Sequence, residues 1–105
     1  MSHSIDRLYE DILKHGDDQT RFPRTAKLLA GSKRRLAQKL GEEAIEVALE
    51  FAAGDRDAVV RESADLLYQL VLIWVAAKIL PEEIGWEMDR RKQTMGLAEK
   101  LPKKV

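Results

Sequence analysis

Hydrophobic residues along this chain recur mostly three and four positions apart, which is the period of an α-helix. The first such run consists of Ile5, Leu8, Tyr9, Ile12 and Leu13. It predicts an amphipathic helix that ends near Gly16. The segment from 17 to 33 is polar and is broken by Pro23 and Gly31. We expect an irregular, partly ordered loop there, with room for one helical turn.

Capping residues define the next two helices. Ser32 is suited to cap a helix that runs to about position 53. Gly54 can close that helix, and Asp55 can cap a third helix from about position 56 to position 79. The apolar stretch from 66 to 77 lies in this third helix. Because a bilayer needs about 20 apolar residues, this stretch is predicted to be a buried core helix.

A fourth long helix is predicted from Pro81 to about Met95, because proline favours the first helical position. No segment alternates apolar and polar residues for long, so the fold class is predicted to be all-α, a bundle of four to five helices. Residues 1 to 105 are expected to form a single domain, with a flexible tail from about position 96.

The helix predicted over 33 to 53 has apolar residues on two sides. One stripe contains Leu36, Leu40, Ala44, Val47 and Phe51. Ile45 and Leu49 lie almost opposite that stripe, and acidic residues fill the sector between them. A surface helix has a single apolar stripe, so this helix is expected to be packed on both sides. The helices carry more apolar surface than one chain can bury, which favours a homodimer.

Two acidic tetrads are the strongest chemical signal. Glu43 and Glu46 are three residues apart on one predicted helix, and Glu62 and Asp65 are three apart on the next. Such pairs share a helix face. Either pair alone is expected by chance in a chain that is 34% charged. Four carboxylates from two packed helices repel one another, however, and a divalent cation such as Mg²⁺ or Mn²⁺ would relieve that repulsion.

Composition narrows the setting. Lys and Arg total 18, as do Asp and Glu, so no net charge favours nucleic acid or a membrane. No cysteine is available for a disulfide, a thiolate metal site or a nucleophile. The first residues lack the pattern of a signal peptide, and we expect a soluble cytoplasmic protein.

Other candidate residues give weaker signals. His3 and His15 are expected at the surface, and Trp74 and Trp86 in a core or an interface. A set of cations is either a solvated face or a grip for substrate phosphates: Arg21, Arg24, Lys27, Lys33, Arg34 and Arg35. Lys39 lies one turn before Glu43, where it can contact phosphate or pair with a neighbouring glutamate.

The residues from 39 to 47 read Lys-Leu-Gly-Glu-Glu-Ala-Ile-Glu-Val, and those from 62 to 68 read Glu-Ser-Ala-Asp-Leu-Leu-Tyr. With Gly54-Asp55 and the Thr25 to Leu29 segment, these strings resemble the phosphoribosyl-ATP pyrophosphohydrolases, a family of all-α nucleoside-triphosphate pyrophosphohydrolases. The resemblance covers about positions 8 to 91. Two departures stand out: Gln69 replaces a common histidine, and Phe22-Pro23-Arg24 replaces the usual lead-in to Thr25.

The resemblance implies Mg²⁺-dependent cleavage of phosphoribosyl-ATP to phosphoribosyl-AMP and pyrophosphate, a step of histidine biosynthesis. The implied metal ligands are Glu43, Glu46, Glu62 and Asp65. Glu42 and Glu43 are the candidate catalytic residues, with Glu42 as an extra ligand or the group that orients the attacking water. Lys39, Arg24 and Lys27 are the candidate substrate-binding residues.

Two alternatives remain at this point. A related enzyme would hydrolyse other nucleoside triphosphates, and a diverged relative would be a helical dimerisation module without activity. A dimerisation module predicts no stabilisation by Mg²⁺, whereas a metal site raises the melting temperature.

Overall fold

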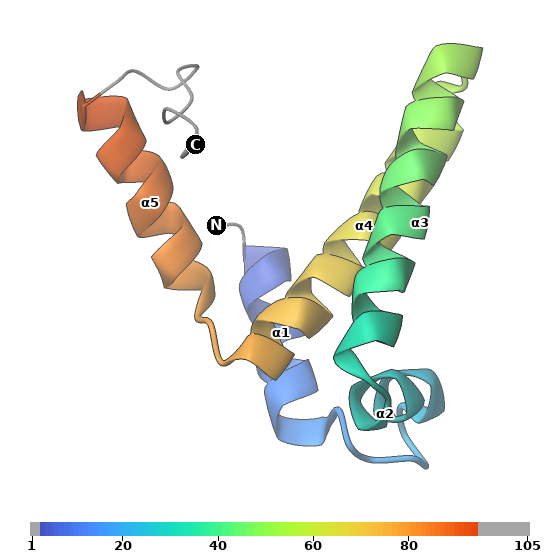
Figure 1. Ribbon diagram of the computed structural model, residues 1–105, viewed down its shortest axis with the longest axis vertical. Helices are drawn as coiled ribbons and strands as arrows, with labels where there is room; N and C mark the ends of the chain where they lie inside the picture. The colour runs from blue at the N-terminus through green and yellow to red at the C-terminus, as the bar shows by residue number, and fades with distance from the viewer. Residues whose placement is uncertain (1–2, 95–105) are drawn as a thin grey trace.

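Five α-helices make up the part of the chain that the structure describes, residues 3–94 of a computed structural model (Figure 1). They are α1 (His3–His15), α2 (Pro23–Ala30), α3 (Lys33–Ala53), α4 (Arg56–Ala77) and α5 (Pro81–Thr94). No β-strand occurs in these residues, and the all-α prediction is confirmed. The tail predicted from position 96 lies outside the described residues.

The predicted caps at the start of α3 and between α3 and α4 are confirmed. The Ser32 hydroxyl accepts a hydrogen bond of 3.1 Å from the Arg35 backbone N–H. The Asp55 carboxylate accepts one of 3.0 Å from the Ala58 N–H. Gly54 has a φ of 77° and ends α3 in the left-handed conformation that glycine adopts without strain. The chain therefore reverses over two residues, and α3 and α4 run antiparallel.

One predicted loop was wrong, and one predicted helix end differs by two residues. The segment from 17 to 33 contains α2, a helix of eight residues rather than a single turn. Pro23 starts α2, and Thr25, Ala26 and Leu28 are buried, so tertiary packing completes a helix that the polar sequence only weakly favours. At the other end, α4 stops at Ala77 instead of position 79, because Lys78 adopts a left-handed φ of 60°.

The hydrophobic core occupies one end of the molecule. It contains Tyr9, Ile12, Leu28, Leu36, Val71, Leu72 and Trp74. These residues come from α1, α2, the start of α3 and the second half of α4. We call this part, residues 3–39 and 68–80, the base. In Figure 1, α1 and α2 lie at this end, and α5 leads away from it.

The rest of α3 and α4 projects from the base as a helical pair, which we call the arm (residues 40–67; Figure 1). Five large apolar side chains of the arm are exposed: Ile45, Leu49, Phe51, Val60 and Leu67. The expected packing of α3 on both sides is therefore not made within one chain.

None of the five described helices is by itself long and apolar enough to cross a membrane. Helices α4 and α5 together meet the length and composition criteria, but they are bent by 104° at the break between them.

Candidate metal and phosphate site

Three carboxylates converge where the arm joins the base. Glu43 comes from α3, and Glu62 and Asp65 come from α4. One oxygen from each lies within 4.8 Å of the others, close enough for all three to ligate one ion. The antiparallel pairing of α3 and α4 produces this convergence, since it brings the middle of each helix beside the middle of the other. The donors are all carboxylate oxygens, the donor type that suits Mg²⁺ and Mn²⁺.

The other two predicted acids lie beside this group rather than in it. Glu46 is exposed, one turn beyond Glu43 on α3. Glu42 forms an ion pair of 3.3 Å with the ammonium of Lys39. The sequence predicted either phosphate or a neighbouring glutamate as the partner of Lys39. In this structure Lys39 pairs with the glutamate, Glu42.

The surroundings of Glu62 disfavour the ionised form of its carboxyl group. Partial burial raises the pKa of this carboxyl above its ordinary value, and the negative charges of Asp65, Glu46, Glu43 and Glu50 raise this pKa further. A raised carboxyl pKa means that the ionised form is disfavoured, and positive charge placed among these oxygens would favour it again. The local field therefore suits a cation.

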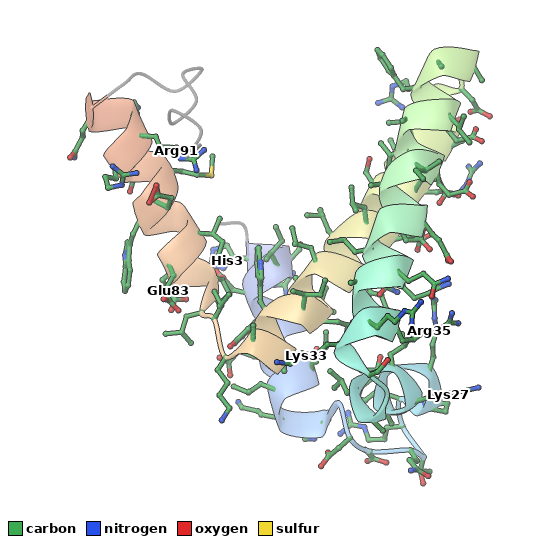
Figure 2. All side chains as sticks on the ribbon, viewed as in Figure 1. His3, Lys27, Lys33, Arg35, Glu83 and Arg91 are labelled. Atoms are coloured by element: carbon green, nitrogen blue, oxygen red, sulfur yellow. The ribbon has the colours of Figure 1, made fainter. Side chains whose placement is uncertain are left out.

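A basic groove of about 350 Å³ lies next to the acidic group. Four cations line it, together with Leu28 and Gly31: Arg24, Lys27, Arg35 and Lys39. Arg24 and Lys27 come from α2, and Arg35 and Lys39 from α3. Lys27 and Arg35 can be located in Figure 2 beside α2 and the start of α3. Because Lys39 precedes Glu43 by one turn, the groove begins about one helical turn from the carboxylates.

Other candidate residues lie elsewhere. Lys33 lines a separate apolar groove with Ile73 and Ala76, on the other side of α3 from Arg35 (Figure 2). The Arg21 guanidinium lies 5.2 Å from the centre of the Phe22 ring.

The tryptophans and histidines differ in their exposure. Trp74 is buried in the core, as predicted, whereas Trp86 is exposed on α5. His3 is exposed, as predicted, and His15 is partly buried.

A bridge between α2 and α4 was missed by sequence reasoning. The hydroxyls of Thr25 and Tyr68 share a hydrogen bond, and the Arg24 guanidinium lies over the Tyr68 ring, 5.6 Å from its centre. The bonded residues are 43 positions apart, so no helical spacing links them. Both residues belong to the strings that carry the family resemblance, which was the one signal that could have found them.

Gln69 follows this bridge directly and is completely buried. No hydrogen-bond partner for either polar atom of its side chain lies within the described part of the protein. The amide is in the core rather than at the carboxylates, so the departure from histidine here leaves the acidic group intact.

Comparisons with known proteins agree with this geometry. The family model for phosphoribosyl-ATP pyrophosphohydrolase matches residues 6–92. "Phosphoribosyl-ATP pyrophosphatase 2" of Rhodopseudomonas palustris is 48% identical over 103 residues, covering 98% of this chain and 79% of that protein. The protein of the same name from Bradyrhizobium diazoefficiens is 50% identical, over 98% of this chain and 77% of its own length. "Phosphoribosyl-ATP pyrophosphatase" of Gluconobacter oxydans is 38% identical, over 91% and 72%. The chain belongs to the phosphoribosyl-ATP pyrophosphohydrolase family.

Proposed function

We propose that this protein is a phosphoribosyl-ATP pyrophosphohydrolase that acts in the cytoplasm as part of histidine biosynthesis. The observation that carries the proposal is the convergence of Glu43, Glu62 and Asp65 within 4.8 Å, beside a groove lined by four cations. A site with cation-binding oxygens at one end and phosphate-binding cations at the other matches a polyphosphate substrate. The names of the relatives agree with this reaction and favour neither of the alternatives.

Glu43, Glu62 and Asp65 would hold Mg²⁺, with Glu46 as a fourth ligand after a change of rotamer. The distances suit this role, since three oxygens already lie within 4.8 Å of one another. The ion, when bound, supplies positive charge that neutralises phosphate oxygens and promotes the ionisation of water. The three carboxylates would position that charge, and the ion would in turn favour the ionised form of Glu62, whose pKa is raised without it.

The basic groove would bind the phosphates that leave as pyrophosphate. Arg24 and Arg35 offer planar guanidinium groups that can bind phosphate through two parallel hydrogen bonds. Lys27 and Lys39 add point charges. Cations at this end stabilise the charge that accumulates on the leaving group when the bond between the α and β phosphates breaks.

Glu42 is the candidate for orienting and deprotonating the attacking water. Its carboxylate lies outside the group of three, so it can accept a proton without giving up a ligand position. The ion pair with Lys39 orients this carboxylate, 3.3 Å from the ammonium. Lys39 would then serve both Glu42 and the phosphates.

The proposal is tested with purified protein, phosphoribosyl-ATP and Mg²⁺. We expect release of pyrophosphate rather than orthophosphate. Asp65→Asn and Glu43→Gln should each lower kcat by at least about 100-fold, because even the loss of groups that only support metal ligands costs about 10–100-fold. Helicity should stay unchanged, since neither side chain belongs to the core.

Glu10→Gln is the matched control, because Glu10 is an exposed acid of α1 that pairs with Lys14 one turn later. It should leave turnover unchanged. Undiminished turnover in both site variants would refute this site. A preference for ordinary nucleoside triphosphates in kcat/KM would instead assign the chain to the broader class of pyrophosphohydrolases.

We propose further that a second copy of the chain covers the arm. Ile45 and Leu49 are 61% and 59% exposed, and Phe51 and Val60 line an apolar groove at the tip of the arm. Apolar surface gathered in this way marks interaction sites. Leu49→Glu should convert a dimer to a monomer in sedimentation or light-scattering measurements. A wild-type protein that is monomeric at micromolar concentration would contradict this proposal.

A further inference from the structure

The bridge between α2 and α4 links the two halves of the site. We propose that Tyr68 is a positioning residue. Through Thr25 and Arg24, it holds the cations of the basic groove at a fixed position relative to the carboxylates. This inference rests on the proposed function, because it assigns Tyr68 a role in binding the phosphate end of the substrate. Tyr68 is not one of the three residues whose oxygens could ligate an ion.

Thr25 ties α2 to α4 through a partly buried contact. Its side chain is 7% exposed, and its hydroxyl bonds to that of Tyr68. A buried hydroxyl that loses its partner pays the full cost of desolvation. The pair therefore favours one position of α2 over positions shifted by an ångström or more.

Arg24 adds a second contact to the same ring. Its guanidinium lies 5.6 Å from the centre of the Tyr68 ring, a distance that suits a cation–π interaction. Arg24 also lines the basic groove. One side chain of α4 thus fixes both the backbone position of α2, through Thr25, and the direction of a groove cation.

Tyr68 lies on the same helix as Asp65, so a contact to Tyr68 can fix the position of α2 relative to the carboxylates. It follows Asp65 by three residues on α4, about 4.5 Å along the helix axis. Helix α4 is rigid over this distance, so a contact to Tyr68 fixes α2 relative to Asp65. Burial of Ala26 and Leu28 anchors α2 in the base, and the contacts to Tyr68 add a directional constraint that apolar packing does not supply. Errors of about 1 Å in placing charged groups cost large factors in binding and rate.

The test uses pyrophosphate with Mg²⁺ as a probe of the basic groove, measured by calorimetry. Tyr68→Phe and Thr25→Val remove the hydrogen bond with little change of shape. Each should weaken pyrophosphate binding about five- to tenfold and raise KM for phosphoribosyl-ATP by a similar factor. We expect kcat within twofold of the wild type and an unchanged rise in melting temperature on adding Mg²⁺. Thr25→Ser keeps a hydroxyl and should restore wild-type affinity.

Val71→Ala is the control for a purely structural role. Val71 is completely buried in the core away from the groove, so the variant should lose stability and keep its affinity for pyrophosphate. If Tyr68→Phe behaves in the same way, the positioning role is refuted. Loss of the Mg²⁺-induced stabilisation in Tyr68→Phe would also refute it, because the residue would then act on the carboxylates.

Combining Tyr68→Phe with Lys27→Gln gives an independent check. If Tyr68 acts through the cations of α2, the combined loss of affinity should be smaller than the product of the two single losses. A combined loss of affinity equal to the product of the two single losses would overturn the inference. Pyrophosphate binding is measured without turnover, so a wild-type protein that fails to hydrolyse phosphoribosyl-ATP would refute the proposed function and leave this test intact.

Discussion

The base and the arm are built from the same two long helices, yet they bury their apolar residues to very different extents. In the base, Val71 and Leu72 have no exposed surface. In the arm, Ala58 is the one buried hydrophobic residue among those described. The base thus contains the hydrophobic core, whereas the arm exposes apolar side chains.

The candidate site lies at the boundary between these regions. Glu43 and Asp65 belong to the arm, and Lys39 and Tyr68 belong to the base. The base carries the cations of the basic groove, and the helix pair of the arm carries the three carboxylates. The antiparallel pairing of α3 and α4 brings Glu43 to Glu62 and Asp65 without any long loop.

Truncating one leucine in each region gives the largest expected contrast in stability. Leu72→Ala should lower the free energy of unfolding by about 2–5 kcal/mol, because it leaves a cavity in a closed core. Leu49→Ala should change the stability of an isolated chain by less than about 0.5 kcal/mol, because its side chain is 59% exposed. Chemical denaturation at low protein concentration measures both.

Repeating the measurement at high concentration sharpens the comparison. If a second copy covers the arm, the cost of Leu49→Ala should grow with protein concentration, since dissociation is coupled to unfolding. If the cost of Leu49→Ala stays small at every protein concentration, no second copy covers Leu49.

The fold was largely predictable because local signals fix it. Ser32, Gly54 and Asp55 are capping residues at the helix ends where they were expected. Helix α2 was missed because its stability comes from burying Thr25 and Leu28 against the rest of the base, a tertiary contribution that a polar sequence does not reveal.

The candidate site was predictable in part. Spacing of three places Glu62 and Asp65 on one face of α4, and three of the four proposed ligands converge. The sequence could not show that Glu46 would lie beside this group rather than in it, nor that Lys39 would pair with Glu42, because both depend on side-chain rotamers. The Thr25–Tyr68 bridge depends on how α2 docks, which no local pattern encodes.

Two glycines offer a second contrast of smaller size. A Cβ at Gly16, in the base, would lie 2.4 Å from the Ile12 carbonyl oxygen and 2.9 Å from a methyl of Leu29. Gly16→Ala should therefore destabilise the protein by about 1–3 kcal/mol. A Cβ at Gly41, in the arm, would have no described atom outside its own helix within 4 Å. Gly41→Ala should stabilise an isolated chain by about 1 kcal/mol, the helix-propensity difference.

Thermal unfolding of both variants, with turnover measured in parallel, checks this contrast. A stabilised Gly41→Ala protein that loses activity would show that substrate or a second copy approaches the helix at this point. Equal destabilisation by both substitutions would mean that the arm is covered as fully as the base.

The smallest effect concerns the charge of Glu62 and reverses sign with Mg²⁺. Its pKa is raised by partial burial and by neighbouring carboxylates, so the ionised form destabilises the metal-free protein above that pKa. Glu62→Gln should then slightly raise the melting temperature at pH 7 without metal, and the difference should shrink as the pH falls through the raised pKa toward 4.5. Glu87 does not interfere in this window, because Arg90 and Arg91 lower its pKa to about 2.

With saturating Mg²⁺ the wild type should become the more stable protein, since the substitution removes a ligand. A wild type that gains no more from Mg²⁺ than Glu62→Gln does would exclude Glu62 from the metal site.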